Sequence, residues 1–117
     1  MSNSKPQQTA SMIYVTCGSL DQARDIARTV VGEHLAACGN IVDGMRSIYR
    51  WEGRVEEGDE VLLILKTRRG LVDALSARVK ELHSFDVPCV VEIPLGAGNA
   101  DYFEWIADET ADGKAPE

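Results

Sequence analysis

The strongest constraint on the fold of this chain is a long candidate β-hairpin between Asn40 and Thr67. Its first arm ends at Trp51, the turn is Glu52-Gly53-Arg54, and its second arm begins at Val55. Each arm has about 11 residues, whereas a usual strand has roughly 5–6. An arm of this length would extend roughly 36 Å. That is long for a compact domain of about 100 residues, whose radius of gyration is roughly 13 Å. Because an overhanging strand leaves backbone N–H and C=O groups unpaired, the sequence predicts a homo-oligomer held together through its strands.

Two helices flank this hairpin in the sequence. Ser19 and Gln22 form a capping-box pattern, and apolar residues at offsets of three and four continue one helix face from there. Gly39 suits the end of this helix, because glycine adopts the left-handed conformation found after many helices. A second helix is expected from Thr67 to about His83.

Two further strands are expected at residues 11–17 and 89–95, and a short last helix is expected after Asn99. The first of these strands is mostly apolar, so we expect it to be buried on both faces. The resulting order, βαββαβ followed by a helix, predicts an α+β fold, the ferredoxin-like sandwich with an antiparallel sheet and two helices on one face. The expected domain organisation is a disordered arm at 1–10, a single domain at 11–108 and a flexible tail at 109–117.

The charge balance of the chain limits its partners. Asp and Glu outnumber Lys and Arg by 19 to 12, which gives a formal net charge of −7. Nucleic acids and anionic membranes need a cationic binding surface, so we expect neither as a partner. An RNA-recognition module shares the βαββαβ order, but its sheet carries stacking aromatics and basic residues, whereas the central strands here are mainly aliphatic.

The three cysteines, Cys17, Cys38 and Cys89, contain no Cys-x-x-Cys pair. An odd and scattered set is typical of free thiols in a reducing compartment. The polar N-terminal stretch carries no apolar signal core, and no stretch approaches the ~20 apolar residues of a membrane span. We therefore expect a cytoplasmic protein.

Several segments resemble one family closely, the divalent-cation tolerance protein CutA family. These segments are Leu35–Ile41, Ser47–Gly53, Glu60–Thr67, Glu81–His83, Val87-Pro88 and Gly98–Tyr102. The resemblance implies a ferredoxin-like subunit that forms a homotrimer through its long strands, with the architecture of the trimeric PII signalling proteins. It also implies a non-enzymatic role in divalent-metal tolerance, with no required cofactor and with copper or another divalent cation as a candidate ligand.

The same resemblance implies a candidate metal site at Cys17 and His83. Cys17 lies at or one residue beyond the family's cysteine position, and His83 occupies one of its histidine positions, while Leu82 stands at the neighbouring one. Simpler alternatives remain open. Cys17 would pack in the core, and His83 would lie at a helix end, where the dipole favours a positive charge.

A second candidate site is a small-molecule cleft between subunits. Glu60 and Lys66 alternate to one face of the returning strand, and a buried Glu and Lys need partners. Their alternative role is an interface ion pair that fixes the strand register. The expected lining, which would suit a small polar ligand, is Tyr49, Trp51, Glu60, Lys66, His83 and Tyr102.

We therefore expect a non-enzymatic trimer linked to divalent-metal tolerance. A Cys–His nucleophile would require a cysteine in hydrogen-bond contact with His83, and we expect no catalytic residue. The alternative is a PII-like regulator that binds a small molecule or a partner protein in clefts between subunits.

Overall fold

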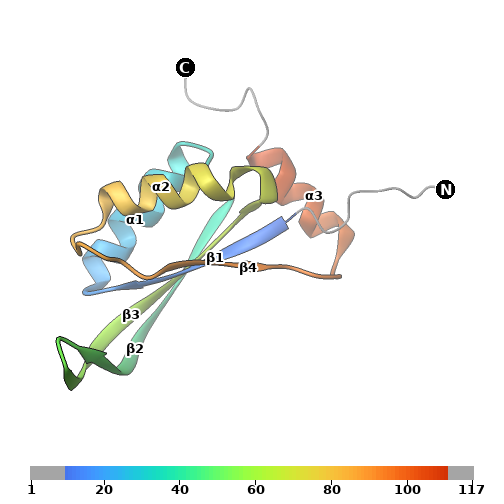
Figure 1. Ribbon diagram of the computed structural model, residues 1–117. Coiled ribbons are helices and arrows are strands. Elements are labelled where there is room, and N and C mark those ends of the chain that lie inside the picture. The colour runs from blue at the N-terminus through green and yellow to red at the C-terminus, as the bar shows by residue number, and fades with distance from the viewer. Residues whose placement is uncertain (1–9, 111–117) are drawn as a thin grey trace.

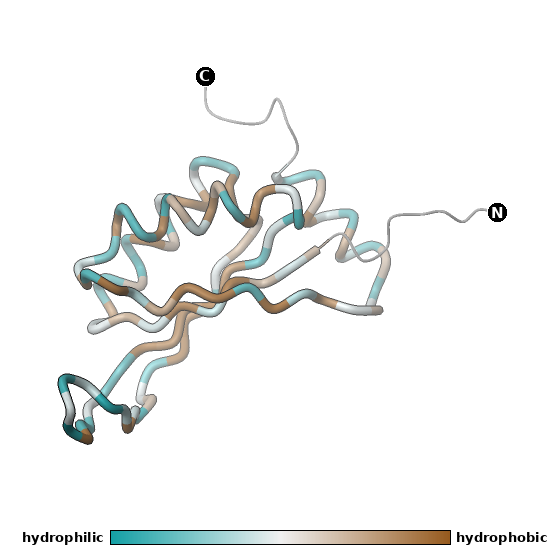
Figure 2. The backbone as a smooth tube through the Cα atoms, viewed as in Figure 1, coloured by the Kyte–Doolittle hydropathy of each residue, from teal (hydrophilic) through white to brown (hydrophobic). Residues whose placement is uncertain are grey.

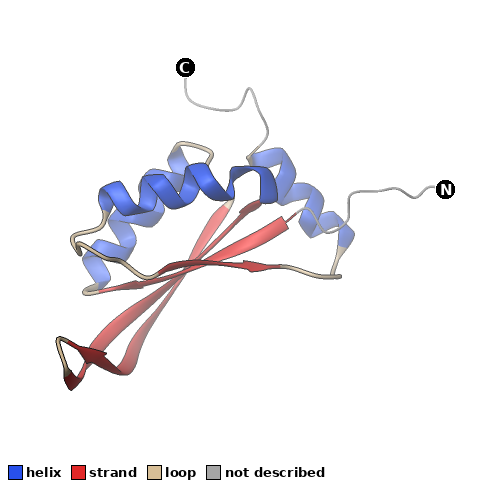
Figure 3. Ribbon diagram, viewed as in Figure 1, coloured by secondary structure: helices blue, strands red, loops and turns tan. Residues whose placement is uncertain are grey.

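A four-stranded antiparallel sheet with two helices packed against one face forms the body of the molecule (Figures 1 and 3). The computed structural model describes residues 10–110. In chain order the elements are β1 (Ala10–Cys17), α1 (Leu20–Gly32), β2 (Cys38–Trp51), β3 (Arg54–Arg68), α2 (Val72–Leu82), β4 (Val90–Pro94) and α3 (Ala100–Glu109). The strand order is β2-β3-β1-β4, which is the order of the ferredoxin-like sandwich. The predicted fold class is therefore confirmed.

The core lies between the sheet and the pair α1 and α2. Alternate side chains of the two central strands point toward these helices, and Ile13, Val15, Leu63 and Leu65 are completely buried there. Hydrophobic positions concentrate where the strands pass beneath the helices (Figure 2). The prediction that the first strand is buried on both faces is wrong, because Tyr14 lies on the face away from α1 and α2 and is only half-buried. We call this second face of the sheet the open face.

The hairpin of β2 and β3 projects well past the body of the molecule, as the sequence predicted (Figure 1). β1 pairs with β3 only from Val61 to Arg68. The preceding part of β3, residues 54–60, pairs with β2 alone. The described chain accordingly measures 54 × 32 × 22 Å and has a radius of gyration of 15.5 Å, above the roughly 13 Å of a compact domain this size.

The hairpin contains a tight turn and an irregularity. Glu52 and Gly53 both have positive φ, 51° and 81°, as a two-residue hairpin turn requires. A register shift between Val42 and Met45 marks a β-bulge around Gly44, whose φ is 83°. The turn matches the sequence prediction, whereas the bulge was not predicted. Bulges increase the local twist of a strand pair. The hairpin arms beyond the bulge therefore run in a different direction from the strands in the body of the sheet.

The predicted end of the first helix is wrong. Ser19 caps α1 as expected, since its hydroxyl accepts a hydrogen bond from the Gln22 amide at 3.1 Å. The helix nevertheless ends at Gly32, because His34 adopts a left-handed conformation with φ of 61°. Gly39 belongs to β2 instead, where an added Cβ would lie 3.1 Å from the Ala27 side chain. The glycine therefore permits close helix–sheet packing.

The predicted start of the second helix is also wrong. Thr67 does not begin a helix but is the penultimate residue of β3, completely buried, and its hydroxyl donates a hydrogen bond to the Leu35 carbonyl at 2.7 Å. A 3-10 turn at Arg69–Leu71 then leads into α2. At the last helix, by contrast, Asn99 caps α3 as predicted, by accepting a hydrogen bond from the Asp101 amide at 2.9 Å.

Ordered elements extend past the predicted bounds of 11–108 at both ends of the described residues. Ala10 belongs to β1 and pairs with Arg68, α3 extends through Glu109, and Thr110 is buried. The rest of the predicted arm and tail, residues 1–9 and 111–117, lies outside the described residues. Within residues 10–110, no helix is long and apolar enough to span a bilayer.

Candidate functional site

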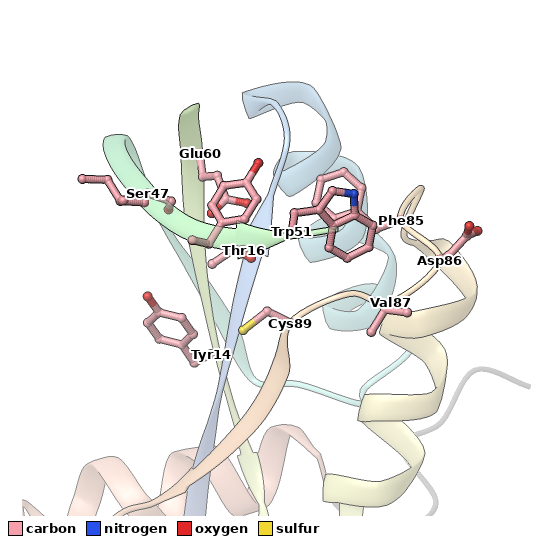
Figure 4. Close-up of a pocket in the computed structure, with 11 residues that line it drawn as sticks. Tyr14, Thr16, Ser47, Trp51, Glu60, Phe85, Asp86, Val87 and Cys89 are labelled. Atoms are coloured by element: carbon pink, nitrogen blue, oxygen red, sulfur yellow. The ribbon is translucent and has the colours of Figure 1, made fainter. Parts of the chain in front are cut away.

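A cleft of about 630 Å³ opens where the hairpin leaves the body of the molecule (Figure 4). Its walls come from β1, both arms of the hairpin and the segment between α2 and β4. Four aromatic side chains contribute to the lining: Tyr14, Tyr49, Trp51 and Phe85. Segments far apart in the sequence thus bring aromatic rings around one hollow.

The strand register explains why the hairpin residues face this cleft. Beyond the bulge, Met45 pairs with Glu60, and the Tyr14 hydroxyl contacts the Met45 sulfur at 3.8 Å on the open face. Tyr49 and Trp51 follow Met45 at even offsets, so alternation places them on the same face. Three of the predicted lining residues, Tyr49, Trp51 and Glu60, therefore do line one cleft.

The cleft lining carries carboxylates and no cation. Among the described residues its charged members are Glu60 and Asp86, and it contains no Lys, Arg or His. Neither carboxylate makes a hydrogen bond or ion pair within residues 10–110. Glu60 is half-buried, whereas Asp86 is exposed. The electrostatic potential of this cleft consequently favours positive charge.

Lys66 and Tyr102 meet at the opposite end of the open face. The Lys66 ammonium donates a hydrogen bond to the Tyr102 hydroxyl at 3.3 Å and lies 5.5 Å from the ring centroid. The Cys38 sulfur lies 3.7 Å from the same hydroxyl, and Trp105 stacks on Tyr102 with ring centroids 5.6 Å apart. These contacts form a second cluster, separate from the cleft.

The predicted lining is therefore divided between two places within one chain. Lys66 follows Glu60 by six positions on the same strand, which corresponds to roughly 20 Å at about 3.3 Å per residue. The two side chains are too far apart to pair within one chain. His83, the sixth predicted residue, does not line the cleft, although its neighbour Phe85 does.

Both ring nitrogens of His83 are hydrogen-bonded to the backbone. The Phe85 amide donates to Nδ1 at 3.1 Å, and Nε2 lies 2.8 Å from the Thr16 carbonyl oxygen. Because a carbonyl only accepts, Nε2 carries the proton and Nδ1 is the acceptor. The ring is buried and lies against Phe85 with centroids 4.6 Å apart. His83 thus joins the end of α2 to β1.

Cys17 is completely buried on the helix-covered side of β1. Burial, with a smaller contribution from the Glu60 carboxylate, raises the pKa of the Cys17 thiol from 9.0 to about 11. The thiolate is the form that binds metals, and it is strongly disfavoured here near neutral pH. The observed environment matches the core-packing alternative for this residue.

The Cys17 and His83 pair does not fit a copper site in this conformation. Copper or zinc needs several converging ligands, whereas both His83 nitrogens are occupied and Cys17 keeps its proton. Across residues 10–110, no three His, Cys, Asp or Glu side chains are grouped so as to hold a metal ion.

Sequence analysis missed two aromatic residues of the cleft. Tyr14 alternates with the buried Ile13 and Val15, so the strand period alone places it on the open face. Phe85 lies in the segment between α2 and β4, where no periodicity indicates the direction of a side chain. Only the folded chain brings it to the hairpin.

Comparison with known proteins shows to which family this chain belongs. The model of the CutA1 divalent ion tolerance protein family matches residues 11–109. A divalent-cation tolerance protein CutA from Thermus thermophilus is 44% identical over 85% of this chain and 96% of its own length. The chloroplastic protein CutA 1 of Oryza sativa is also 44% identical over 85% of this chain, which spans only 56% of that protein's length. The crystal structure of CutA from Xylella fastidiosa superimposes with a TM-score of 0.86 at 34% identity, over 88% of this chain and 99% of that one. The chain therefore belongs to the CutA1 divalent ion tolerance protein family.

Proposed function

We propose that this protein acts as a homotrimer in the response to divalent metal ions, without catalysing a reaction. The observation that carries this proposal is the projecting hairpin. Residues 54–60 of β3 have no strand partner on the side where β1 pairs with the rest of β3, and the outer edge of β2 has none within residues 10–110. Such edges are templates for pairing with another chain.

Side chains on the hairpin support the same conclusion. Ile48 and Val55 are 67% and 66% exposed, and Trp51 on the opposite face is 54% exposed. Apolar groups left in water on both faces of a strand pair favour burial against further protein. A closed ring of copies satisfies every edge without forming an open filament, and the number three is the one that the family resemblance implies.

Sedimentation equilibrium of the full chain at micromolar concentration tests the assembly. The proposal predicts a mass about three times the 12.8 kDa of one chain. A monomer would contradict it.

The link to metal rests on family membership, and the Thermus thermophilus relative is named a divalent-cation tolerance protein. Because Cys17 and His83 do not fit a copper site, we propose that the metal response does not depend on a site at this pair. Calorimetric titration of copper into the wild type and His83→Ala tests this, and equal binding is expected. Loss of copper binding in the variant alone would assign His83 to a metal site after all.

The absence of catalysis is part of the same proposal. The candidate nucleophile Cys17 keeps its proton, and both nitrogens of the candidate base His83 are held by the backbone.

We also propose a cytoplasmic location for this protein. The cysteines at 17, 38 and 89 are free, which supports this location, since thiols stay reduced there.

A second candidate function is a PII-like regulator that binds a small molecule. The specific observation in its favour is the cleft of about 630 Å³ beside the hairpin, which is within the size range of small-molecule sites. The two functions are compatible, because a trimer can carry three such clefts. Saturable binding of a defined small molecule without metal would support this second function.

A further inference from the structure

We propose that the cleft beside the hairpin receives a second copy of this chain, and that Lys66 of that copy pairs there with Glu60. The inference rests on the trimer proposed above and names the contact that holds neighbouring copies in register. It follows from two charged groups of β3 that have no counter-ion within one chain. The cleft considered above for a small molecule would then be completed by two chains.

The open face of β3 carries opposite charges at its two ends. Four half-buried residues alternate there with residues buried under the helices: Glu60, Leu62, Ile64 and Lys66. An apolar strip therefore separates the carboxylate from the ammonium group. The separation is roughly 20 Å at about 3.3 Å per residue, so neither charge can neutralise the other within one chain.

Glu60 lacks a cation. The other three carboxylates of β3, those of Glu56, Glu57 and Asp59, each pair with an arginine at 3.0 to 3.3 Å. Glu60 has no such partner within residues 10–110, and the cleft lining around it contains no Lys, Arg or His. A half-buried carboxylate without a counter-ion costs free energy, and a cation from another copy would remove that cost.

Lys66 lacks an anion. Its ammonium group contacts the hydroxyl and the ring of Tyr102, both uncharged, and forms no ion pair with a carboxylate of residues 10–110. In the sheet Lys66 pairs with Cys38 of β2, and the outer edge of β2 has no strand partner in the described part of the chain. The ammonium group thus lies beside an edge that the proposed assembly covers.

The two patches complement each other in charge and resemble each other in their aromatic side chains. Exposed aromatic residues accompany both charges, Tyr49 and Trp51 at the carboxylate and Tyr102 and Trp105 at the ammonium group. Aromatic residues are enriched in the buried centres of interfaces. Contact between two identical patches would oppose like charges, which is costly. Contact between unlike patches pairs them, and in a closed ring of three this contact runs head to tail.

A second copy is the occupant that satisfies both patches at once. A small cation would neutralise Glu60 and leave Lys66 without an anion, and a small anion would do the reverse. Neither would cover Ile48 and Val55, which the hairpin leaves exposed. Another copy supplies both charges together with apolar surface.

Charge reversal in the full chain tests the pair. Glu60→Lys and Lys66→Glu each place like charges at all three contacts of the trimer, so each should raise the dissociation constant by at least about tenfold per contact. The double variant restores opposite charges at every contact and should return to within about tenfold of the wild type. Sedimentation equilibrium measures the trimer fraction, at a urea concentration that leaves half of the wild type trimeric.

Two further reversals serve as matched controls. Asp25→Lys and Lys80→Glu make the same charge changes at exposed positions of α1 and α2, on the other side of the sheet. Neither residue forms an ion pair within residues 10–110, and both variants should leave the trimer fraction unchanged. Losses equal to those of the β3 variants would show a general charge effect and would overturn the assignment. Circular dichroism without urea checks that every variant is folded.

The same measurements separate this inference from the proposed assembly. Trimers that survive both single reversals, or a double variant no better than the single ones, would overturn the pair and leave the trimer in place. A wild type that sediments as a monomer would contradict both. Because Glu60 and Lys66 lie roughly 20 Å apart in one chain, rescue by the double variant can come only from a contact between copies.

Discussion

The two halves of β3 behave as different parts of the molecule. From Val61 to Thr67, alternate side chains are buried under the helices, and the backbone pairs on both sides. From Arg54 to Glu60, no side chain is buried, and the backbone pairs on one side only. One strand therefore combines a segment stabilised by its own domain with a segment that its own domain leaves incomplete.

This difference shows which contacts stabilise the monomer. Full burial of a Leu or Val side chain contributes roughly 1.5–3 kcal/mol, and the second half of β3 buries Val61, Leu63 and Leu65. The first half buries none of its side chains, so it contributes little until another surface covers it. The body of the domain should therefore fold without the hairpin tip, whereas assembly should not occur without it.

The sharpest contrast is expected from deletions of apolar side chains. Leu63→Ala should lower the free energy of unfolding by about 2–5 kcal/mol, because it leaves a cavity in a packed core. Leu20→Ala, at a position 39% exposed at the start of α1, should cost clearly less. Urea denaturation at one fixed protein concentration gives both values. Equal losses would show that the core is not where the stability lies.

Shortening the hairpin should separate assembly from folding. Replacing residues 47–58 with an Asn-Gly turn removes the tip and most of the unpaired part of β3. We expect a monomer that keeps its helical circular dichroism signal. The melting temperature of the full chain should rise with protein concentration, because folding and assembly are linked, and that of the shortened chain should not. A shortened chain that still forms trimers would contradict the role given to the tip.

The pH dependence of the unfolding free energy should reveal the raised pKa of Cys17. Its pKa is raised in the fold from 9.0 to about 11, so above pH 9 the unfolded chain loses this proton while the native chain keeps it. Stability should fall between pH 9 and pH 11, by on the order of 2 kcal/mol from this group. Because other groups also titrate there, the measurement is the difference in unfolding free energy between wild type and Cys17→Ala across this range. Parallel curves would contradict the raised pKa.

The smallest effect on stability is expected from removing the ion pair between Glu33, which directly follows α1, and Arg78 of α2. Two hydrogen bonds from Arg78, each 2.9 Å, lower the pKa of Glu33 from 4.5. The charged pair therefore stabilises the fold above about pH 4.5, and this contribution is lost as the pH falls through the lower folded-state pKa. Glu33→Gln should lower the melting temperature slightly at pH 7 and not at pH 3. Exposed pairs contribute little, so a large effect would contradict this assignment.

Regular alternation and capping patterns made much of this fold predictable. The period of two identified β3, and the Ser19 and Asn99 caps matched the observed helix starts. The end of α1 was not predictable from periodicity, because Leu35 continues the apolar spacing and still packs against the core after His34 has ended the helix. Apolar spacing indicates burial and not backbone conformation, which here changes at one left-handed residue.

The candidate site was predictable only where strand alternation determines it. Tyr49, Trp51 and Glu60 share a face of one hairpin, and the structure places all three on the cleft. Phe85 reaches the same cleft from the segment before β4, and Lys66 lies with Tyr102 at the far end of the open face. These placements depend on tertiary packing and on distance along the strand, which local patterns do not encode.

Amide hydrogen exchange of residues 54–60, followed residue by residue in the full chain, tests the central claim most directly. In an antiparallel strand paired on one side only, alternate amides are left without a partner. If sister copies complete this part of β3, every amide in the segment should exchange as slowly as those of residues 61–68. Alternate amides that exchange at the rate of a free peptide, while residues 61–68 stay protected, would show that the hairpin remains unpaired in solution.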